Sequence, residues 1–400
     1  MIEMQVSHVG TGSQYNRVRL IDKEEHIVFP FFVGSSDARA ITMALAGEFD
    51  DRPSTHDLML AVFARYAITI RRVVISDLIG GTYRAQLMLE SRDGSIVEVD
   101  ARPSDAIVVA LRTGASIYVS PVLLEQAGFV ANQFVDLGSH KLSMHCSGEG
   151  APTVVLEAGL GLAGSSWQQV QEAVSQFTRV VSYDRAGIGA SEPGPEPRTS
   201  QDMVTDLHAL LVSSGIEEPY VFVGHSLGGF TVRLYTDQYR QEVAGMVLID
   251  VAHPDYYNRV LSVLPQESPD ESIELKEFRR FATTFVRDPL LNTEKFMWET
   301  SAAQIRDTAL LEDIPLIVLS RGQSEPWQGF PLDLKIHIEN VGMELQRDLV
   351  SLSSNAIHIV AEHSGHMIHF DQPNLVLNAI RKVVETIRLS RSSKESPRAS

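Results

Sequence analysis

Residues 221–230 read VFVGHSLGGF, and this stretch decides the fold of the second half of the chain. An apolar run typical of a buried strand stops at Gly224, and the spacing Gly224-His225-Ser226-Leu227-Gly228 leads into a helical pattern over 230–239. Glycine on either side of a central serine is typical of a sharp strand-to-helix turn that lifts the hydroxyl above the sheet edge. The motif therefore indicates a nucleophilic serine, although a glycine-rich loop can also match it by chance.

Around this motif, residues 134–388 alternate between strand and helix patterns. Continuous Val, Ile and Leu runs predict strands at 153–157, 180–183, 220–223, 244–249, 316–320 and 357–361. Such runs are typical of a mostly parallel sheet with helices on both faces. The alternation lapses into polar helical sequence at about 252–314, which predicts a helical cap inserted over the site. Residues 389–400 are polar and charged, and we expect a disordered tail there.

Residues 1–130 have a different rhythm, which predicts a separate α+β domain. Four hundred residues also exceed what one core usually holds. Strand-like runs at 27–33, 72–75, 83–89 and 96–99 are mixed with helical patterns at 36–46, 55–64 and 104–111. Gly80-Gly81 lies between two of these runs and predicts a hairpin turn.

The composition limits the cellular setting and the partners. The N-terminus has no apolar core typical of a signal peptide, and no apolar run reaches the roughly 20 residues that span a bilayer. A single cysteine, Cys146, excludes an internal disulfide and favours a cytoplasmic location. The net charge of −17 disfavours non-specific attraction to nucleic acid or anionic lipid. The sequence leaves open whether the chain forms an oligomer.

A nucleophilic serine needs a base, and His366 is the candidate. It lies in the loop Ser364-Gly365-His366, which follows the last predicted strand and precedes a helix. His363 and His369 are three residues away on either side, so a metal-binding cluster and a purely structural histidine are the alternatives.

The orienting acid is Asp250 in our interpretation, with Glu325 in reserve. Asp250 ends the strand immediately after the nucleophile's strand and helix, and the carboxyl ends of parallel strands face one crevice. The next strand is followed by a loop that offers only Glu325. The alternative is that Asp250 merely caps its own loop.

An oxyanion formed by serine attack requires backbone amide donors. We expect Leu227, the residue after the nucleophile, to supply one of them. The second is expected from Leu160, which follows the tight turn at Gly159 after an early strand. A phosphate-binding interpretation of this glycine-rich loop is weak, because we find neither a Gly-Lys-Ser/Thr pattern nor a Gly-x-Gly-x-x-Gly pattern with a helix behind it. No cofactor is therefore expected in this domain.

From about residue 134 to 384 the chain resembles the α/β-hydrolase superfamily, on VVLEAGLG, SYDRAGIGAS, YVFVGHSLGG, VAGMVLIDVAHPD and SGHMIHFDQP. The resemblance implies Ser226 as nucleophile, His366 as base, and Leu160 and Leu227 as oxyanion donors. Serine rather than aspartate as nucleophile implies esterase, lipase-like or amidase chemistry. The pattern departs from the family at Glu157-Ala158, which stand in place of the common His-Gly. Asp184 and Arg185 are expected to hold the turn near the site.

In the N-terminal part the triplet Arg-Pro-Ser occurs twice, at 52–54 and 102–104, and opens a helical pattern each time. Proline suits the first turn of a helix and serine caps its free amides. An arginine at a helix N-terminus also suits a phosphate. We take five residues as candidates for phosphate chemistry, although arginine–aspartate pairs that only hold the fold are the alternative: Arg52, His56, Asp57, Arg102 and Asp105.

Residues 3–128 resemble the bifunctional nuclease family, on FPFFVGSSDARAI, RPSTHDLM, VVISDLIGGTYRAQLML and VEVDARPSDAIVVALRTGASIYV. The resemblance implies DNase or RNase activity and nucleic acid as a partner. Glu98 and Asp100 are candidate ligands for a divalent metal in this domain.

Three functional hypotheses follow. The first is a serine hydrolase of small esters or amides that carries a nuclease-like domain. The second is a metal-dependent nuclease in which the hydrolase is secondary. In the third, the N-terminal domain only binds partners or assembles the protein.

Overall fold

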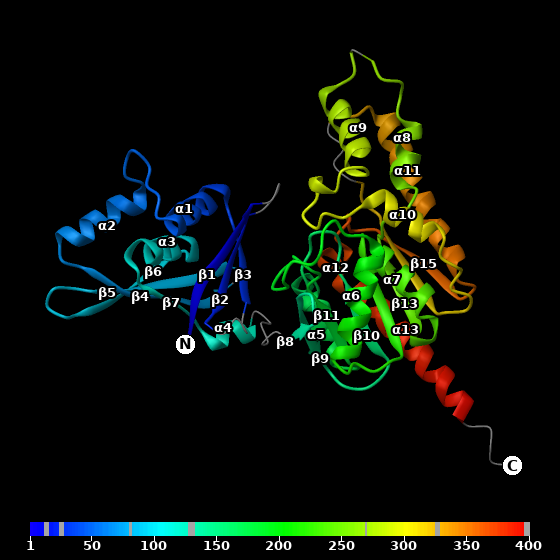
Figure 1. Cartoon of the computed structure of the whole chain (residues 1–400), viewed down its shortest axis with the longest axis horizontal. Coiled ribbons are helices and arrows are strands. Elements are labelled where there is room, and N and C mark those ends of the chain that lie inside the picture. Colours follow the sequence, from blue (N-terminus) through cyan, green and yellow to red (C-terminus); the bar gives the residue numbers. More distant parts are fainter. Residues whose placement is uncertain are drawn as a thin grey trace. The chain divides into compact units, whose positions relative to one another are not determined.

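The computed structural model describes residues 1–11, 16–23, 28–79, 82–126, 133–268, 270–324 and 329–395. The chain divides into two compact units, residues 1–133 and 134–400 (Figure 1). Each unit has its own buried core. None of the described helices is both long and apolar enough to cross a membrane.

The N-terminal unit is built on one mixed sheet with the strand order β3-β2-β1-β7-β4-β5-β6. All neighbours pair antiparallel except β4 and β7, which are parallel. The strands are β1 (Ile2–Thr11), β2 (Asn16–Asp22), β3 (Val28–Val33), β4 (Thr69–Ile79), β5 (Thr82–Glu90), β6 (Ile96–Ala101) and β7 (Ser116–Val119). The antiparallel pairing of β4 with β5 fits the expected hairpin, whose turn at Gly80-Gly81 lies outside the described residues.

The helices of this unit are α1 (Ser35–Ala46), α2 (Thr55–Arg65), α3 (Pro103–Thr113) and α4 (Pro121–Gln126). Ser54 caps α2 in a reciprocal capping box with Asp57, and Pro103 occupies the first turn of α3. The middle of α3 is buried against the sheet, which makes it the central core helix. The expected α+β class is confirmed.

The C-terminal unit contains a larger sheet with the order β15-β14-β13-β12-β10-β11-β9-β8. From β15 to β11 in this order, every strand pairs parallel with its neighbour, including β12 with β10 and β10 with β11. Strand β9 pairs antiparallel with β11. The strands are β8 (Gln133–Asp136), β9 (Lys141–Ser147), β10 (Thr153–Glu157), β11 (Val180–Tyr183), β12 (Tyr220–His225), β13 (Val243–Ile249), β14 (Leu316–Arg321) and β15 (Ala356–Ala361).

Helices cover both faces of this sheet, and two buried clusters fill the layers between helices and strands. The covering helices include α5 (Gln168–Ser175), α6 (Ser200–Ser213), α7 (Gly228–Gln238), α12 (Ile368–Asp371) and α13 (Pro373–Glu395), with short 3₁₀ turns η1 (Gly164–Trp167), η2 (Arg240–Glu242) and η4 (Leu349–Leu352). The mostly parallel sheet with helices on both faces that the strand pattern predicts is confirmed, and so is the α/β-hydrolase fold that the resemblance implies.

A helical cap lies beyond the carboxyl ends of the strands, as Figure 1 shows at the top of this unit. It contains α8 (Tyr256–Val263), α9 (Ile273–Phe285), the turn η3 (Pro289–Leu291) and α10 (Trp298–Arg306). The expected range of 252–314 misses a later contributor, because α11 (Leu332–Asp348) packs its apolar side against α8 and α9 in the same small core. Sequence order hides this contact, since β14 separates the two segments.

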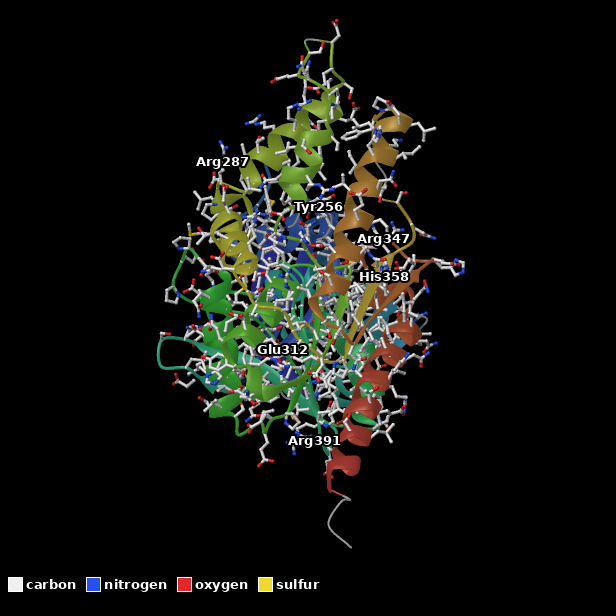
Figure 2. The ribbon with its side chains drawn as sticks, turned by 90° about the vertical axis from the view of Figure 1, so that its right-hand side faces the viewer. Tyr256, Arg287, Glu312, Arg347, His358 and Arg391 are labelled. Carbon is white, nitrogen blue, oxygen red and sulfur yellow. The ribbon has the colours of Figure 1, made fainter. Side chains whose placement is uncertain are left out.

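The expectation of disorder from residue 389 is wrong for residues 389–395, because α13 continues to Glu395. Residues 389–395 contain no glycine or proline and extend a helix that is already nucleated, so continuation needs no new nucleus. The last turns, near Arg391, extend away from the sheet (Figure 2). Residues 396–400 lie outside the described part of the chain.

Candidate active site

Ser226 occupies a strained turn between β12 and α7. Its φ is +51°, in the left-handed region that side chains other than glycine rarely adopt. The turn is tight enough to require its glycines: a Cβ on Gly228 would lie 2.5 Å from the carbonyl oxygen of Glu157. A Cβ on Gly224 would lie 3.0 Å from the backbone of Gly228. The spacing of the motif therefore has a steric cause in the packing of α7 against β10.

The structure brings Asp250 and His366 together across 116 residues of sequence. Asp250 Oδ2 lies 2.6 Å from His366 Nδ1. Asp250 follows the end of β13 with a φ of +40°, and its backbone N–H donates to the Leu319 carbonyl at 2.7 Å. Burial would raise the pKa of Asp250, but the hydrogen bond from His366 and the charge of Arg321 hold it below its ordinary value. Asp250 is thus an ionised partner for His366.

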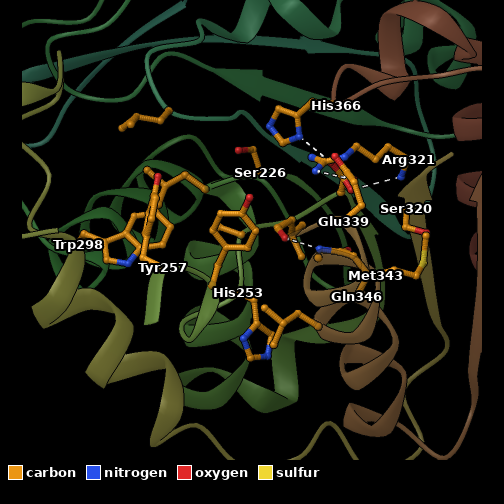
Figure 3. A pocket seen from close by; sticks show the side chains of 18 of the residues that line it. Ser226, His253, Tyr257, Trp298, Ser320, Arg321, Glu339, Met343, Gln346 and His366 are labelled. Atoms are coloured by element: carbon orange, nitrogen blue, oxygen red, sulfur yellow. Dashed lines mark hydrogen bonds and ion pairs between the residues drawn. The ribbon is translucent and has the colours of Figure 1, made fainter. Parts of the chain in front are cut away.

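Arg321, at the end of β14, is a site residue that the sequence did not reveal. Its Nη1 lies 3.3 Å from Asp250 Oδ2, and its Nη2 lies 3.4 Å from Glu339 Oε2 on α11. Figure 3 shows it beside the pocket, on the same side as His366. The available signal was its position at the carboxyl end of a parallel strand, next to the strand that ends at Asp250.

Both expected oxyanion donors lie at the same pocket. Leu160 and Leu227 line a cavity of about 540 Å³ together with Ser226, Asp250 and His366. Leu227 immediately precedes α7, so its amide lies at the positive end of the helix dipole. The five residues expected in this domain from the sequence therefore share one cavity. The reserve acid, Glu325, lies outside the described residues.

The wall of the cavity beneath the cap is aromatic. It includes Tyr257, Phe281, Phe285 and Trp298, with ring centroids of Tyr257 and Trp298 5.0 Å apart (Figure 3). Arg321 and two polar side chains of α11, Glu339 and Gln346, line the side of the cavity away from Tyr257 and Trp298 (Figure 3). One side of the pocket thus suits an apolar substituent and the other side suits polar groups.

His225, inside the serine motif, packs behind the site. It is buried, its ring centroid is 4.7 Å from that of His366, and its Nε2 lies 3.0 Å from the His366 carbonyl oxygen, to which it donates. Burial holds the pKa of His225 well below its ordinary value, with the neighbouring histidines adding to the effect. A neutral His225 therefore supports the loop that carries His366.

The metal-cluster alternative at the C-terminal histidines finds no support in the geometry. His369 is buried against Trp167, with ring centroids 4.5 Å apart, and burial lowers its pKa to about 4. In the part of the chain that the structure describes, no group of three or more His, Cys, Asp or Glu side chains could hold a metal ion.

In the N-terminal unit, three of the five phosphate candidates are joined through Asp105 near the N-termini of α2 and α3. His56 Nε2 lies 3.0 Å from Asp105 Oδ1, and Arg102 Nε donates to Asp105 Oδ2 at 2.8 Å. Asp57 lies outside this group, because it completes the capping box of α2 with Ser54 and its Oδ1 is 3.5 Å from Arg112 Nε. The hydrogen bond from Arg102 lowers the pKa of Asp105, which outweighs the effect of burial.

The remaining candidates of this unit do not join that group. Arg52 is exposed and makes no hydrogen bond or ion pair with another described residue. Glu98 and Asp100 lie on the exposed edge strand β6, where Asp100 is 3.9 Å from Arg84. Neither belongs to a carboxylate cluster of metal-binding size among the residues with described positions.

Two protein-family models match the chain. Residues 18–132 match the bifunctional nuclease domain, and residues 154–379 match the alpha/beta hydrolase family. A curated relative, the "Uncharacterized protein YqjL" of Bacillus subtilis, is 28% identical over 241 residues, which are 60% of this chain and 87% of the relative. The "Probable transporter efuK" of Hormonema carpetanum is 28% identical over 302 residues, 64% of this chain. This chain spans 43% of the length of that relative.

Among solved structures, a thermophilic esterase from Thermogutta terrifontis is 20% identical and aligns with a TM-score of 0.45. The alignment covers 64% of this chain and 99% of the esterase. The hydrolase match spans more than half of the 400 residues and contains the serine turn, Asp250 and His366. The chain therefore belongs to the alpha/beta hydrolase family and carries a bifunctional nuclease domain in its N-terminal part.

Proposed function

We propose that the C-terminal unit hydrolyses small esters or amides through an acyl-enzyme formed on Ser226. The observation that carries this proposal is the 2.6 Å contact between Asp250 and His366 at the cavity that Ser226 lines. A proton on His366 Nδ1, shared with ionised Asp250, leaves the lone pair of Nε2 to accept the serine proton.

The reaction follows from these positions. Ser226 Oγ attacks the carbonyl carbon while its proton passes to His366 Nε2, and the carbonyl oxygen becomes an oxyanion. The amides of Leu160 and Leu227 donate hydrogen bonds to that oxygen. The carbon–oxygen or carbon–nitrogen bond then breaks, and the leaving group takes the proton from His366. Water repeats the sequence on the acyl-enzyme, releases the acid and restores Ser226.

The aromatic wall supports an apolar acyl or alcohol group as the substrate's larger part. Burying such a group contributes about 25 cal/mol per Å² of apolar surface removed from water. The polar wall with Arg321 supports a hydrogen-bonding group at the other end of the substrate.

We expect the purified full chain to react with a fluorophosphonate probe, because the phosphonate mimics the tetrahedral oxyanion and requires both an activated serine and working amide donors. Labelling should be followed by gel fluorescence and by peptide mass spectrometry of the modified residue. Modification of Ser226 supports the proposal. Folded protein that stays unlabelled, or carries the label on another residue, contradicts it.

The N-terminal unit supports a second candidate function, cleavage of nucleic acid. The favouring observation is the contact of His56 with Asp105, which Arg102 also binds, at the N-termini of two helices. A histidine oriented by a carboxylate is suited to proton transfer, and the guanidinium of Arg102, with a side chain 65% exposed, is suited to a phosphate.

For this activity we expect the full chain to cleave a fluorescent single-stranded oligonucleotide, with His56→Ala at least about 100-fold slower, in line with general acid–base contributions. Ser226→Ala is the matched control and should cleave at the wild-type rate. A parallel reaction with EDTA tests for a divalent metal. Cleavage that His56→Ala leaves unchanged, or oligonucleotide binding without cleavage, contradicts this activity, and the latter outcome favours a binding module.

A further inference from the structure

A buried cluster of three charged side chains lies next to the loop that carries Leu160. The three residues are Glu157 at the end of β10, Arg185 after β11, and Glu294 in the cap segment between η3 and α10. Their side chains are at most 4% exposed. Arg185 donates from Nη1 to Glu157 at 2.8 Å, and from Nε and Nη2 to the two oxygens of Glu294, each at 2.7 Å.

The same cluster holds the backbone of the loop over residues 158–161. Arg185 donates to the carbonyl oxygens of Ala158 and Gly159, both at 2.6 Å. From the cap side, Glu294 Oε1 accepts the N–H of Gly161 at 2.6 Å. Gly161 has a φ of +72°, which suits glycine. Three backbone groups of a short loop are therefore fixed by side chains from distant elements.

These contacts set the direction of the Leu160 amide. The Gly159 carbonyl and the Leu160 N–H belong to one planar trans peptide unit, so they point in opposite directions. Because the carbonyl faces Arg185, the N–H faces away from it, and Leu160 is one of the residues that line the cavity.

The segment that delivers Glu294 is itself anchored. The side chain of Asn292 donates to the Phe296 carbonyl at 3.0 Å and accepts the Phe296 N–H at 2.8 Å. Arg198, before α6, exchanges backbone hydrogen bonds with Lys295 and Met297. These hydrogen bonds hold the backbone on either side of Glu294, so the cap segment presents its carboxylate from a fixed position.

Stability alone gives a weak account of this cluster, since a buried ion pair is often no more stabilising than an apolar replacement of similar volume. We propose that Arg185 and Glu294 are positioning residues that hold the Leu160 amide in its oxyanion-binding direction, and so tie catalysis to the cap segment at 292–297. This inference rests on the proposed hydrolase function.

The test compares Glu294→Gln with wild type on p-nitrophenyl butyrate and on the fluorophosphonate probe. The glutamine keeps the size but loses the charge that the Arg185 fork requires. We expect kcat and the second-order labelling rate to fall together by about 10- to 100-fold, below the 10²- to 10³-fold loss on deleting an oxyanion donor. KM should stay within about twofold, since ground-state contacts are unchanged.

Glu271→Gln is the matched control. Glu271 is another cap carboxylate, 3% exposed and paired with Arg279 at 2.6 Å, and that pair is separate from the contacts that hold residues 158–161. It should keep kcat and the labelling rate within about twofold of wild type. A second variant, Glu294→Asp, keeps the charge but shortens the reach, and should lose rate in the same way if Glu294→Gln does not fold.

The possible outcomes distinguish a failure of the positioning role from a failure of the hydrolase proposal. Wild type that neither labels nor hydrolyses the ester overturns the hydrolase proposal itself. Wild type that labels on Ser226, while folded Glu294 variants keep the wild-type kcat and labelling rate, overturns only the positioning role. An equal loss in Glu271→Gln also overturns it, because any disturbed cap ion pair would then have the same effect.

Discussion

Ser226→Ala should lower ester hydrolysis by about 10⁴-fold or more in kcat, which is the scale of losses when a triad nucleophile is removed. In the proposed mechanism this side chain supplies the atom that forms the covalent bond, so we expect no neighbouring group to compensate. The measurement is the steady-state rate on p-nitrophenyl esters, together with loss of fluorophosphonate labelling.

Alanine at this position should leave the fold intact, because the substitution removes one oxygen and adds no atom to the tight turn. Ser213→Ala, at the exposed end of α6, is the matched control and should label and hydrolyse like wild type. Residual hydrolysis of Ser226→Ala above a tenth of the wild-type rate would exclude Ser226 as the nucleophile.

Asp250→Asn should lower kcat by about 10³- to 10⁴-fold. An amide nitrogen at this place donates a hydrogen bond, so His366 would have to turn or keep its proton on Nε2, and neither state accepts the serine proton. Arg321 would also lose its charge partner 3.3 Å away. The measurement is kcat on the same ester, beside Glu339→Gln as the control that loses only the outer partner of Arg321 and should stay within about tenfold.

The pH dependence of folding gives an independent check on Asp250. Its pKa is lowered in the folded chain, so its contribution to stability is present above the unfolded value of about 3.9 and is lost as the pH falls through the lower folded value. The thermal midpoint should therefore fall less between pH 6 and pH 3 in Asp250→Asn than in wild type.

The kinetic result that would contradict the assignment of Asp250 is an Asp250→Asn variant with the kcat of wild type. Another group would then orient His366, and Glu325 is the first candidate.

The sequence predicted the parts of this structure that depend on local pattern. Buried strands such as β12 and β13 are continuous apolar runs, and the serine turn is marked by glycines whose absence of a side chain is a steric requirement. Strands β1, β2 and β9 escaped prediction although each lies between two other strands of its sheet. Their sequences mix polar and apolar residues and so lack the continuous apolar run that marks β12 and β13.

In the site, residues at strand ends could be assigned, since parallel strands all deliver their carboxyl ends to one edge. Glu294 could not be assigned from the sequence, because it lies in an irregular cap segment. Its proposed role depends on a contact with Arg185, which is 109 residues away in the sequence. The role of α11 in the cap was hidden for the same reason. Long-range contacts between side chains leave no periodic trace in a sequence.

The order of strands also determines when the site is complete during folding. Ser226 and Asp250 end consecutive strands joined by a single helix, so their half of the site has low contact order and can assemble early. His366 comes after β14, α11 and β15, and its contact with Asp250 closes a span of 116 residues. Under the proposed mechanism, a chain that has formed the serine turn but not yet docked β15 holds the proposed nucleophile without its base, so hydrolysis has to wait until the last strand of the sheet is in place.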